Sequence, residues 1–286
     1  MTALPPPQPQ HAAVRSEPIA PAPPQQTQPQ FHTPAPTPAP TQPQFAPPPA
    51  PHATLPIPVA IGAIVVLTAS LIVSKLLLDA LVGLEWPVAV YVALLTGVGY
   101  GPSMAWCLYA SKRWGSGSLA RDAGLTPRWS DLGWAPVIWL STLGVQAAVI
   151  GIILAVDIPI SSNTDGVTEL QADRTYVVAI VIAAVIAAPL VEEIVFRGVV
   201  MRALLSRVAV VPTIAIQGFL FGAAHVDPVR GVGNIGLVIV LTAVGCSFGA
   251  AAYWLRRIGP TILAHAIYNG VVLTVILSGL ADRLDS

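Results

Sequence analysis

Seven long apolar stretches restrict what this chain can fold into more than any other feature of its sequence. A helix needs about 20 apolar residues to cross the ~30 Å hydrocarbon core of a bilayer. Backbone polar groups are satisfied there only in helices and closed barrels, and runs of this length indicate helices. The sequence therefore predicts an all-α polytopic membrane protein with about seven transmembrane helices, or eight. The expected spans lie near residues 57–79, 87–110, 134–156, 175–205, 208–226, 233–255 and 259–280.

The composition agrees with a membrane protein and argues against one that binds nucleic acid. Only 10% of the 286 residues are charged and 54% are hydrophobic, and the mean hydropathy is +0.71. The formal net charge is zero, so no basic field would attract nucleic acid. Lysine is scarce beside arginine, while alanine and valine are abundant, which favours a bacterial source. We therefore expect an integral protein of a bacterial plasma membrane.

The first 56 residues differ from the rest of the chain. They hold 19 of the 29 prolines, separated by glutamine, alanine and threonine. Such a segment buries too little apolar surface to offset its ordering entropy, so we predict a disordered tail with polyproline II character. Polyproline II segments bind SH3-like and WW-like domains, but a flexible tail without a dedicated partner is the simpler expectation.

The charges between the apolar stretches predict the orientation of the chain. Arginine and lysine gather after the second, fourth and sixth stretches, whereas acidic residues dominate after the first and third. The positive-inside rule assigns the arginine-bearing segments to the cytoplasm. Seven spans then leave the proline-rich tail in the cytoplasm and the C-terminus outside.

Strongly polar side chains are rare in the last four apolar stretches, and six of them stand out. An ionised carboxylate near the centre of a membrane helix costs about 2.5–3.5 kcal/mol, so such a residue is a functional candidate. Two adjacent acids and an arginine occur in the segment APLVEEIVFRG, and two histidines and an asparagine follow in later stretches. The candidate site residues are Glu192, Glu193, Arg197, His225, His265 and Asn269.

Helical spacing divides the charges of APLVEEIVFRG into two groups. Glu193 and Arg197 are four positions apart with the acid first, so we expect an ion pair on one helix face. Glu192 points about 100° away from Glu193 and needs another partner. Pro189 removes a backbone hydrogen bond beside the acids and predicts a bend. A purely structural ion pair that joins two helices is the alternative interpretation of Glu193 and Arg197.

The other candidates lie at depths that let them meet Glu192. His265 and Asn269 are four positions apart and share a helix face. At 1.5 Å per residue, Glu192 and His225 lie about 20 Å along their helices from the predicted turn between them. His265 and Asn269 lie about 12 and 18 Å along the last helix from Arg257. We therefore expect these four polar residues to form one site within the membrane.

A site of this composition fits two hydrolytic mechanisms. A buried glutamate can act as a general base on water, while His265 and Asn269 donate hydrogen bonds to a developing oxyanion. Alternatively, Glu193, His225 and His265 could hold a zinc ion that binds the water, although the usual HExxH sequence is absent. The sequence does not separate a zinc enzyme from one without a cofactor. A transporter with a buried Glu/His site is a third alternative, but no inverted repeat supports it.

Three short patterns occur in order on three predicted helices. They read EExxxR at 192–197, FxxxH at 221–225 and HxxxN at 265–269. Together they resemble the CAAX-processing and bacteriocin-processing (CPBP, Abi-type) family of intramembrane endopeptidases. The resemblance covers about residues 175–275. Composition and hydropathy give the parts before it, so we expect a disordered cytoplasmic tail (1–56), N-terminal transmembrane helices (57–170) and a catalytic transmembrane core (171–280).

The resemblance implies an endopeptidase that cleaves membrane-associated proteins or peptides. It assigns water activation to Glu192 with His225. The oxyanion site would comprise His265 and Asn269, and the expected ion pair would support both. Members of the family are described as zinc-type and as metal-independent glutamic peptidases, so the cofactor is left open. A non-proteolytic scaffold or immunity protein of the same fold is the alternative function.

Overall fold

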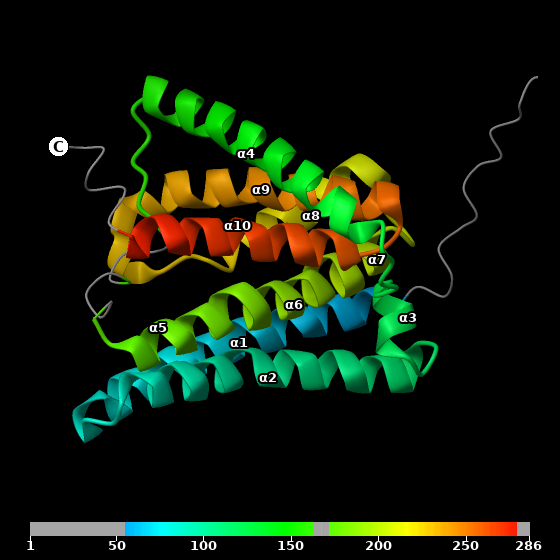
Figure 1. Cartoon of the computed structure of the whole chain (residues 1–286). Coiled ribbons are helices and arrows are strands. Elements are labelled where there is room, and N and C mark those ends of the chain that lie inside the picture. Colours follow the sequence, from blue (N-terminus) through cyan, green and yellow to red (C-terminus); the bar gives the residue numbers. More distant parts are fainter. Residues whose placement is uncertain (1–54, 163–166, 168–171, 279–286) are drawn as a thin grey trace, which may run out of the picture. The chain divides into compact units, whose positions relative to one another are not determined.

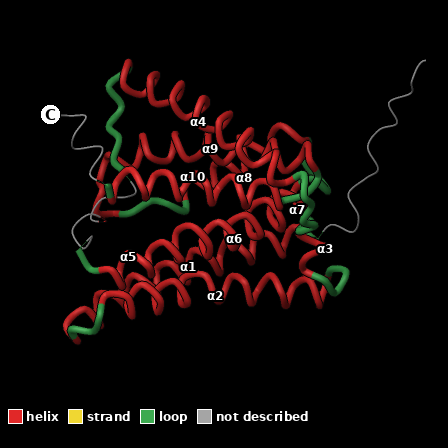
Figure 2. The backbone as a smooth tube through the Cα atoms, viewed as in Figure 1, coloured by secondary structure: helices red, strands yellow, loops and turns green. Residues whose placement is uncertain are grey.

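The computed structural model of this protein describes residues 55–162, 167 and 172–278. These residues lie in one compact unit, Ala50–Ser286. Every regular element of this part is a helix (Figure 2), which confirms the predicted all-α class. The predicted disordered tail lies outside the described residues, except for its last two.

The helices occur where the apolar stretches predict them. The N-terminal helices are α1 (Ile57–Leu81), its 3₁₀ extension η1 (Val82–Leu84), α2 (Val88–Trp114), the short α3 (Leu119–Ala123) and α4 (Asp131–Ala155). The fourth stretch forms a central rod of five consecutive segments: α5 (Arg174–Val181), η3 (Ile182–Ala187), α6 (Ala188–Glu192), η4 (Glu193–Val200) and α7 (Met201–Leu204). The chain ends with α8 (Val210–Ala223), the 3₁₀ helix η5 (Pro228–Gly233), α9 (Asn234–Leu255) and α10 (Gly259–Leu277).

Six helical segments of the described chain are long and apolar enough to cross a membrane, which makes this an integral membrane protein. The fifth expected span is α8, whose 14 residues extend about 21 Å and fall short of the ~30 Å hydrocarbon core. The chain continues through η5, where the Ser161 N–H beyond α4 donates to the Gly233 carbonyl at 3.1 Å. The described residues thus form six full-length spans where seven were expected, and the shorter α8 takes the place of the fifth.

The arginine-bearing segments meet at one end of the bundle, which we call the arginine end. Arg257, between α9 and α10, forms an ion pair with Asp131 at the start of α4, with 2.7 Å between Nε and Oδ1. Arg202, near the end of the central rod, donates to the carbonyl of Arg256 at 3.0 Å. This clustering agrees with the positive-inside rule, which predicts these segments on one side of the membrane.

The central rod lies between two groups of helices (Figure 1). Helices α1 and α2 pack against each other and against the rod, while α10 packs on the rod from the other side and on α4. All eight residues of η4 are buried. Glu193 and Arg197 belong to this segment, so they face protein rather than lipid, as charges at membrane depth must.

Close helix packing occurs at one of the two glycine pairs that the sequence suggests. The four-residue spacing of Gly245 and Gly249, and of Gly97 and Gly101, is typical of helix contacts in membranes. A Cβ added to Gly245 in α9 would lie 2.9 Å from the Cα of Gly218 in α8, so only glycine permits this contact. A Cβ added to Gly97 or Gly101 would meet no described atom within 4 Å. The packing interpretation is therefore correct for α9 and wrong for α2.

Candidate active site

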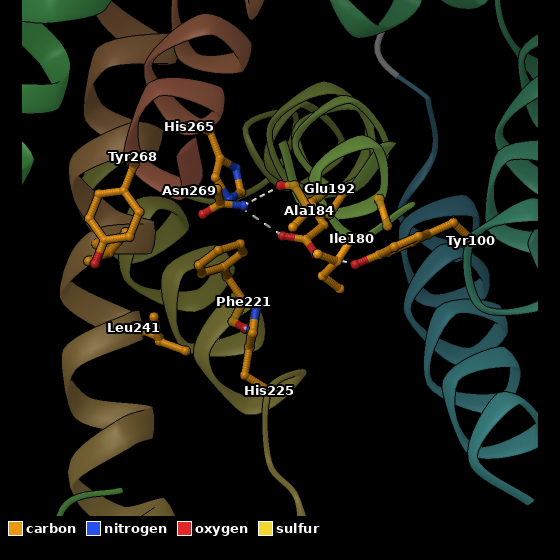
Figure 3. A pocket seen from close by; sticks show the side chains of 13 residues that line it. Tyr100, Ile180, Ala184, Glu192, Phe221, His225, Leu241, His265, Tyr268 and Asn269 are labelled. Carbon is orange, nitrogen blue, oxygen red and sulfur yellow. Dashed lines mark hydrogen bonds and ion pairs between the residues drawn. The ribbon is translucent and has the colours of Figure 1, made fainter. Parts of the chain in front are cut away.

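A cavity of about 270 Å³ lies where α2, the central rod, α8, α9 and α10 converge (Figure 3). Four of the six predicted site residues line it. These are Glu192, His225, His265 and Asn269. The structure thus brings together the four side chains that the helical depths place at one level. Glu193 and Arg197 do not line the cavity and lie in the protein behind it.

Glu192 faces the cavity from the end of α6 and is 7% exposed. Its Oε1 accepts a hydrogen bond of 2.6 Å from the hydroxyl of Tyr100 in α2. Its Oε2 lies 3.8 Å from Nε2 of His265. No arginine or lysine of the described chain forms an ion pair with this carboxylate. The prediction that Glu192 has partners other than Arg197 is therefore confirmed.

Glu193 and Arg197 form the predicted ion pair inside the protein. The distance between Oε1 and Nη1 is 2.7 Å, and both side chains are fully buried. Arg197 also donates through Nη2 to the carbonyl of Gly245 at 3.0 Å. Its guanidinium carbon lies 4.5 Å from the ring centroid of Phe221, a cation–π distance. The pair therefore joins the central rod to α8 and α9, as the structural interpretation expects.

His265 lies between the two acids. Its Nδ1 is 3.2 Å from Oε1 of Glu193, and its Nε2 faces Glu192. A neutral imidazole carries one N–H, so donation from Nδ1 to Glu193 leaves the Nε2 lone pair directed to the cavity. The separation of 3.8 Å between Nε2 and Glu192 is longer than a hydrogen bond. One histidine thus connects the buried ion pair to the cavity carboxylate.

Asn269 fills a gap in the backbone hydrogen bonds of the central rod. The Ala188 N–H donates to the carbonyl of Ala183, five positions earlier, as in a π-helix. Pro189 follows and has no N–H, so the carbonyl of Ala184 lacks a donor five positions ahead. The side-chain nitrogen of Asn269 donates to that carbonyl at 2.7 Å. The amide keeps a second N–H, which this bond does not use.

His225 borders the cavity at the end of α8. Its Nδ1 lies 2.8 Å from the carbonyl of Phe221, and this contact fixes the ring. The Phe221 ring has centroid distances of 4.9 Å to His225 and 5.8 Å to His265, so it separates the two imidazoles (Figure 3). The following connection is held by Lys75, whose Nζ lies 2.5 Å from Oδ1 of Asp227. This hydrogen bond lowers the pKa of Asp227, which lies outside the spans.

The three side chains of the alternative zinc site, Glu193, His225 and His265, are not assembled around one point. Among the described residues, no three His, Cys, Asp or Glu side chains form a group that could hold a metal ion. Oε1 of Glu193 contacts both Arg197 and His265. A metal ion bound to this oxygen would be repelled by the guanidinium of Arg197, whose Nη1 is 2.7 Å from the same oxygen. Glu193, His225 and His265 therefore do not fit a zinc site in this arrangement.

Tyr100 is the site residue that the sequence does not reveal. It lies in α2 within the segment GVGYG, outside the region that resembles a known family. It is one of three tyrosines in α2, with Tyr91 and Tyr109, and nothing in the sequence distinguishes it from the other two as functional. Its contact with Glu192 links residues 92 positions apart and is visible only in the fold. The N-terminal helices therefore also contribute a side chain to the cavity.

The fold and the cavity define an integral membrane protein with a polar site inside its helix bundle. Residues 174–271 match the model of a family described as Rce1-like, type II CAAX prenyl endopeptidase Rce1-like. This match runs from the start of the central rod into α10, and it confirms the resemblance to the CPBP family over that region. The family is one of CAAX-type endopeptidases, which suggests an intramembrane protease. Comparison with the curated proteins found no match to the chain, and comparison with the solved structures found none either.

Proposed function

We propose that this protein is an intramembrane endopeptidase that hydrolyses peptide bonds of membrane-associated proteins or peptides. The proposal rests on the surroundings of Glu192. Its carboxylate borders a cavity inside the bundle, one oxygen is held by Tyr100, and the other faces His265. A carboxylate that is held in one orientation beside a cavity can act as a general base on a water molecule, and hydrolysis of a peptide bond by water needs such a base. The family match over residues 174–271 supports the same reaction class.

Glu192 acts as the general base. The Tyr100 hydrogen bond occupies Oε1 and leaves Oε2 to take a proton from a water molecule in the cavity. The water oxygen forms a bond to the carbonyl carbon of the substrate, and the carbonyl oxygen becomes an oxyanion. The C–N bond then breaks, and Glu192 returns the proton to the leaving nitrogen. The carboxylate ends the cycle in its initial state, so it serves as base and then as acid.

Asn269 and the two histidines provide the remaining polar contacts. The second N–H of Asn269 can donate to the oxyanion, since the first is fixed on the carbonyl of Ala184. His265 can share a proton with Glu192 through Nε2, because Glu193 holds Nδ1. His225, fixed by its own Nδ1 contact, can orient the attacking water. The Glu193–Arg197 pair keeps His265 in position and does not touch the substrate.

The test is a comparison of membrane-protein fragments in cells that carry either the wild-type protein or Glu192→Gln. New N-termini in membrane proteins, identified by mass spectrometry, should appear with the wild type and disappear with Glu192→Gln. The glutamine keeps the size of the side chain but cannot take the proton from water. Asp79→Asn is the matched control, because Asp79 is an exposed acid of α1 outside the cavity. Its set of new N-termini should equal that of the wild type.

Two outcomes would reject the proposal. If Glu192→Gln produces the same new N-termini as the wild type, Glu192 is not the base. If no new N-termini depend on the protein, and Glu192→Gln restores a deletion strain as well as the wild type does, the protein acts as a scaffold. Flux of ions or solutes through the wild type in proteoliposomes would support the transporter alternative instead. Both variants must remain monodisperse in detergent for the comparison.

A further inference from the structure

A second cavity lies at the arginine end, apart from the proposed active site. It has a volume of about 450 Å³, within the ~300–1,000 Å³ range of ligand pockets. The α3–α4 connection, the start of α4, the rod and the start of α10 form its walls. Its inner surface is aliphatic. The side chains are Leu125, Leu132, Leu190, Ile262 and Leu263. We call this cavity the arginine-end groove.

The rim of the groove is positively charged. Arg128 lines it, is exposed, and forms no ion pair with a described residue. Asp131 also lines the groove, but its charge is already compensated. Its Oδ1 is 2.7 Å from Nε of the buried Arg257, and its Oδ2 accepts the backbone N–H of Arg128 at 3.0 Å. Of the two charged residues that line the groove, Arg128 is thus the one whose charge no described side chain neutralises.

The groove leads from the membrane surface into the hydrocarbon region. Trp129 also lines it, beside Arg128, and is 90% exposed, as expected for an indole at a membrane–water interface. Leu263 lies about 6 Å along α10 from its first residue, Gly259. Leu190, in α6 of the rod, lines the same groove and is 37% exposed. A ligand of this groove must therefore have an anionic head and an apolar tail.

We propose that the arginine-end groove binds one anionic phospholipid. Its phosphate pairs with the guanidinium of Arg128, and the indole of Trp129 lies at the level of the headgroup. An acyl chain follows the aliphatic wall toward Leu190 and Leu263. A zwitterionic phospholipid fits the apolar wall equally well, but its ammonium group weakens the attraction to an unpaired arginine. Anionic lipid near a juxtamembrane arginine is favoured by about fivefold, which sets the expected preference.

The test uses the full-length protein in lipid nanodiscs that contain brominated phospholipid, which quenches nearby tryptophan fluorescence. The fluorescence difference between the wild type and Trp129→Phe isolates the signal of Trp129 among the seven tryptophans. At an equal mole fraction, brominated phosphatidylglycerol should quench this signal more than brominated phosphatidylcholine, with about a fivefold preference in apparent affinity. Arg128→Gln should remove the preference. Arg121→Gln should keep it, because Arg121 is an exposed arginine of α3 that does not line the groove.

The controls make the proposal easy to reject. Equal quenching by the two lipids in the wild type would show that no anionic lipid is selected. If the preference for anionic lipid persists in Arg128→Gln, it arises at another site. If it falls equally in Arg128→Gln and Arg121→Gln, it reflects the overall positive charge of the arginine end. Each of these outcomes overturns the site. The measurement does not involve peptide cleavage, so its result is independent of the proposed protease function.

Discussion

The hydroxyl of Tyr100 in α2 donates a 2.6 Å hydrogen bond to Oε1 of Glu192 in the central rod. A hydrogen bond to a charged group is typically worth about 1.5–3 kcal/mol. Here it fixes the orientation of the carboxylate, so that Oε2 faces His265 and the cavity. Tyr100 is therefore a positioning residue in the proposed mechanism, although it comes from the N-terminal helices.

Tyr100→Phe should lower kcat by roughly tenfold and leave KM nearly unchanged, because the hydroxyl contacts the base rather than the substrate. The assay is cleavage of a peptide that spans a bond found in the fragment comparison. Tyr91→Phe is the matched control on the same helix, since its hydroxyl donates to the carbonyl of Leu81 at 2.8 Å and not to an acid. Equal kinetics in the two variants would contradict a positioning role for Tyr100.

Glu193→Gln should destabilise the protein strongly, because it leaves the guanidinium of Arg197 buried without its counter-charge. Breaking a buried ion pair costs about 3–5 kcal/mol. The midpoint of thermal unfolding in detergent should therefore fall well below that of the control Asp79→Asn. The double variant Glu193→Leu/Arg197→Met removes both charges and should unfold at a higher temperature than Glu193→Gln. If Glu193→Gln unfolds at the wild-type temperature, the ion pair does not stabilise the fold.

The bond from Asn269 to the carbonyl of Ala184 should depend on Pro189. Asn269→Ala leaves that carbonyl without a donor and should cost about 1 kcal/mol. Pro189→Ala restores a backbone N–H that can close on the rod, so Asn269→Ala should cost less in that background. A double-mutant cycle of unfolding free energies measures the coupling between the two positions. Strict additivity would contradict the account of Asn269 as a substitute donor.

The two glycine pairs should respond oppositely to a methyl group. Gly245→Ala would force α8 and α9 apart, and overpacking of this kind costs about 1–3 kcal/mol. Gly97→Ala adds its methyl group to open space on α2 and should be neutral or slightly stabilising, since alanine favours helices over glycine. Thermal unfolding of both variants decides the matter. A similar loss of stability in both would show that α2 also packs through its glycines.

Local features of the sequence were sufficient for the helices and for one interaction within the site. Apolar stretches of about 20 residues specify membrane helices because the bilayer offers the backbone no other partner. The Glu193–Arg197 pair follows from the four-residue spacing of a helix face. The length of α8 was overestimated, because the apolar residues beyond Ala223 lie in a connection and not in the helix. Hydropathy alone does not distinguish apolar residues of a helix from apolar residues of the connection that follows it.

The sequence by itself determined an all-α membrane protein and named four residues of one cavity, because periodicity and burial cost act within single helices. Only the tertiary structure decided what each of them contacts. It gave Glu192 its hydrogen bond from Tyr100, put His265 between both acids and turned Asn269 toward a carbonyl that Pro189 leaves open. These contacts join helices that are distant in sequence. They depend on which helix faces meet when the bundle packs. The spacing of residues along one helix does not specify which face of another helix it will contact.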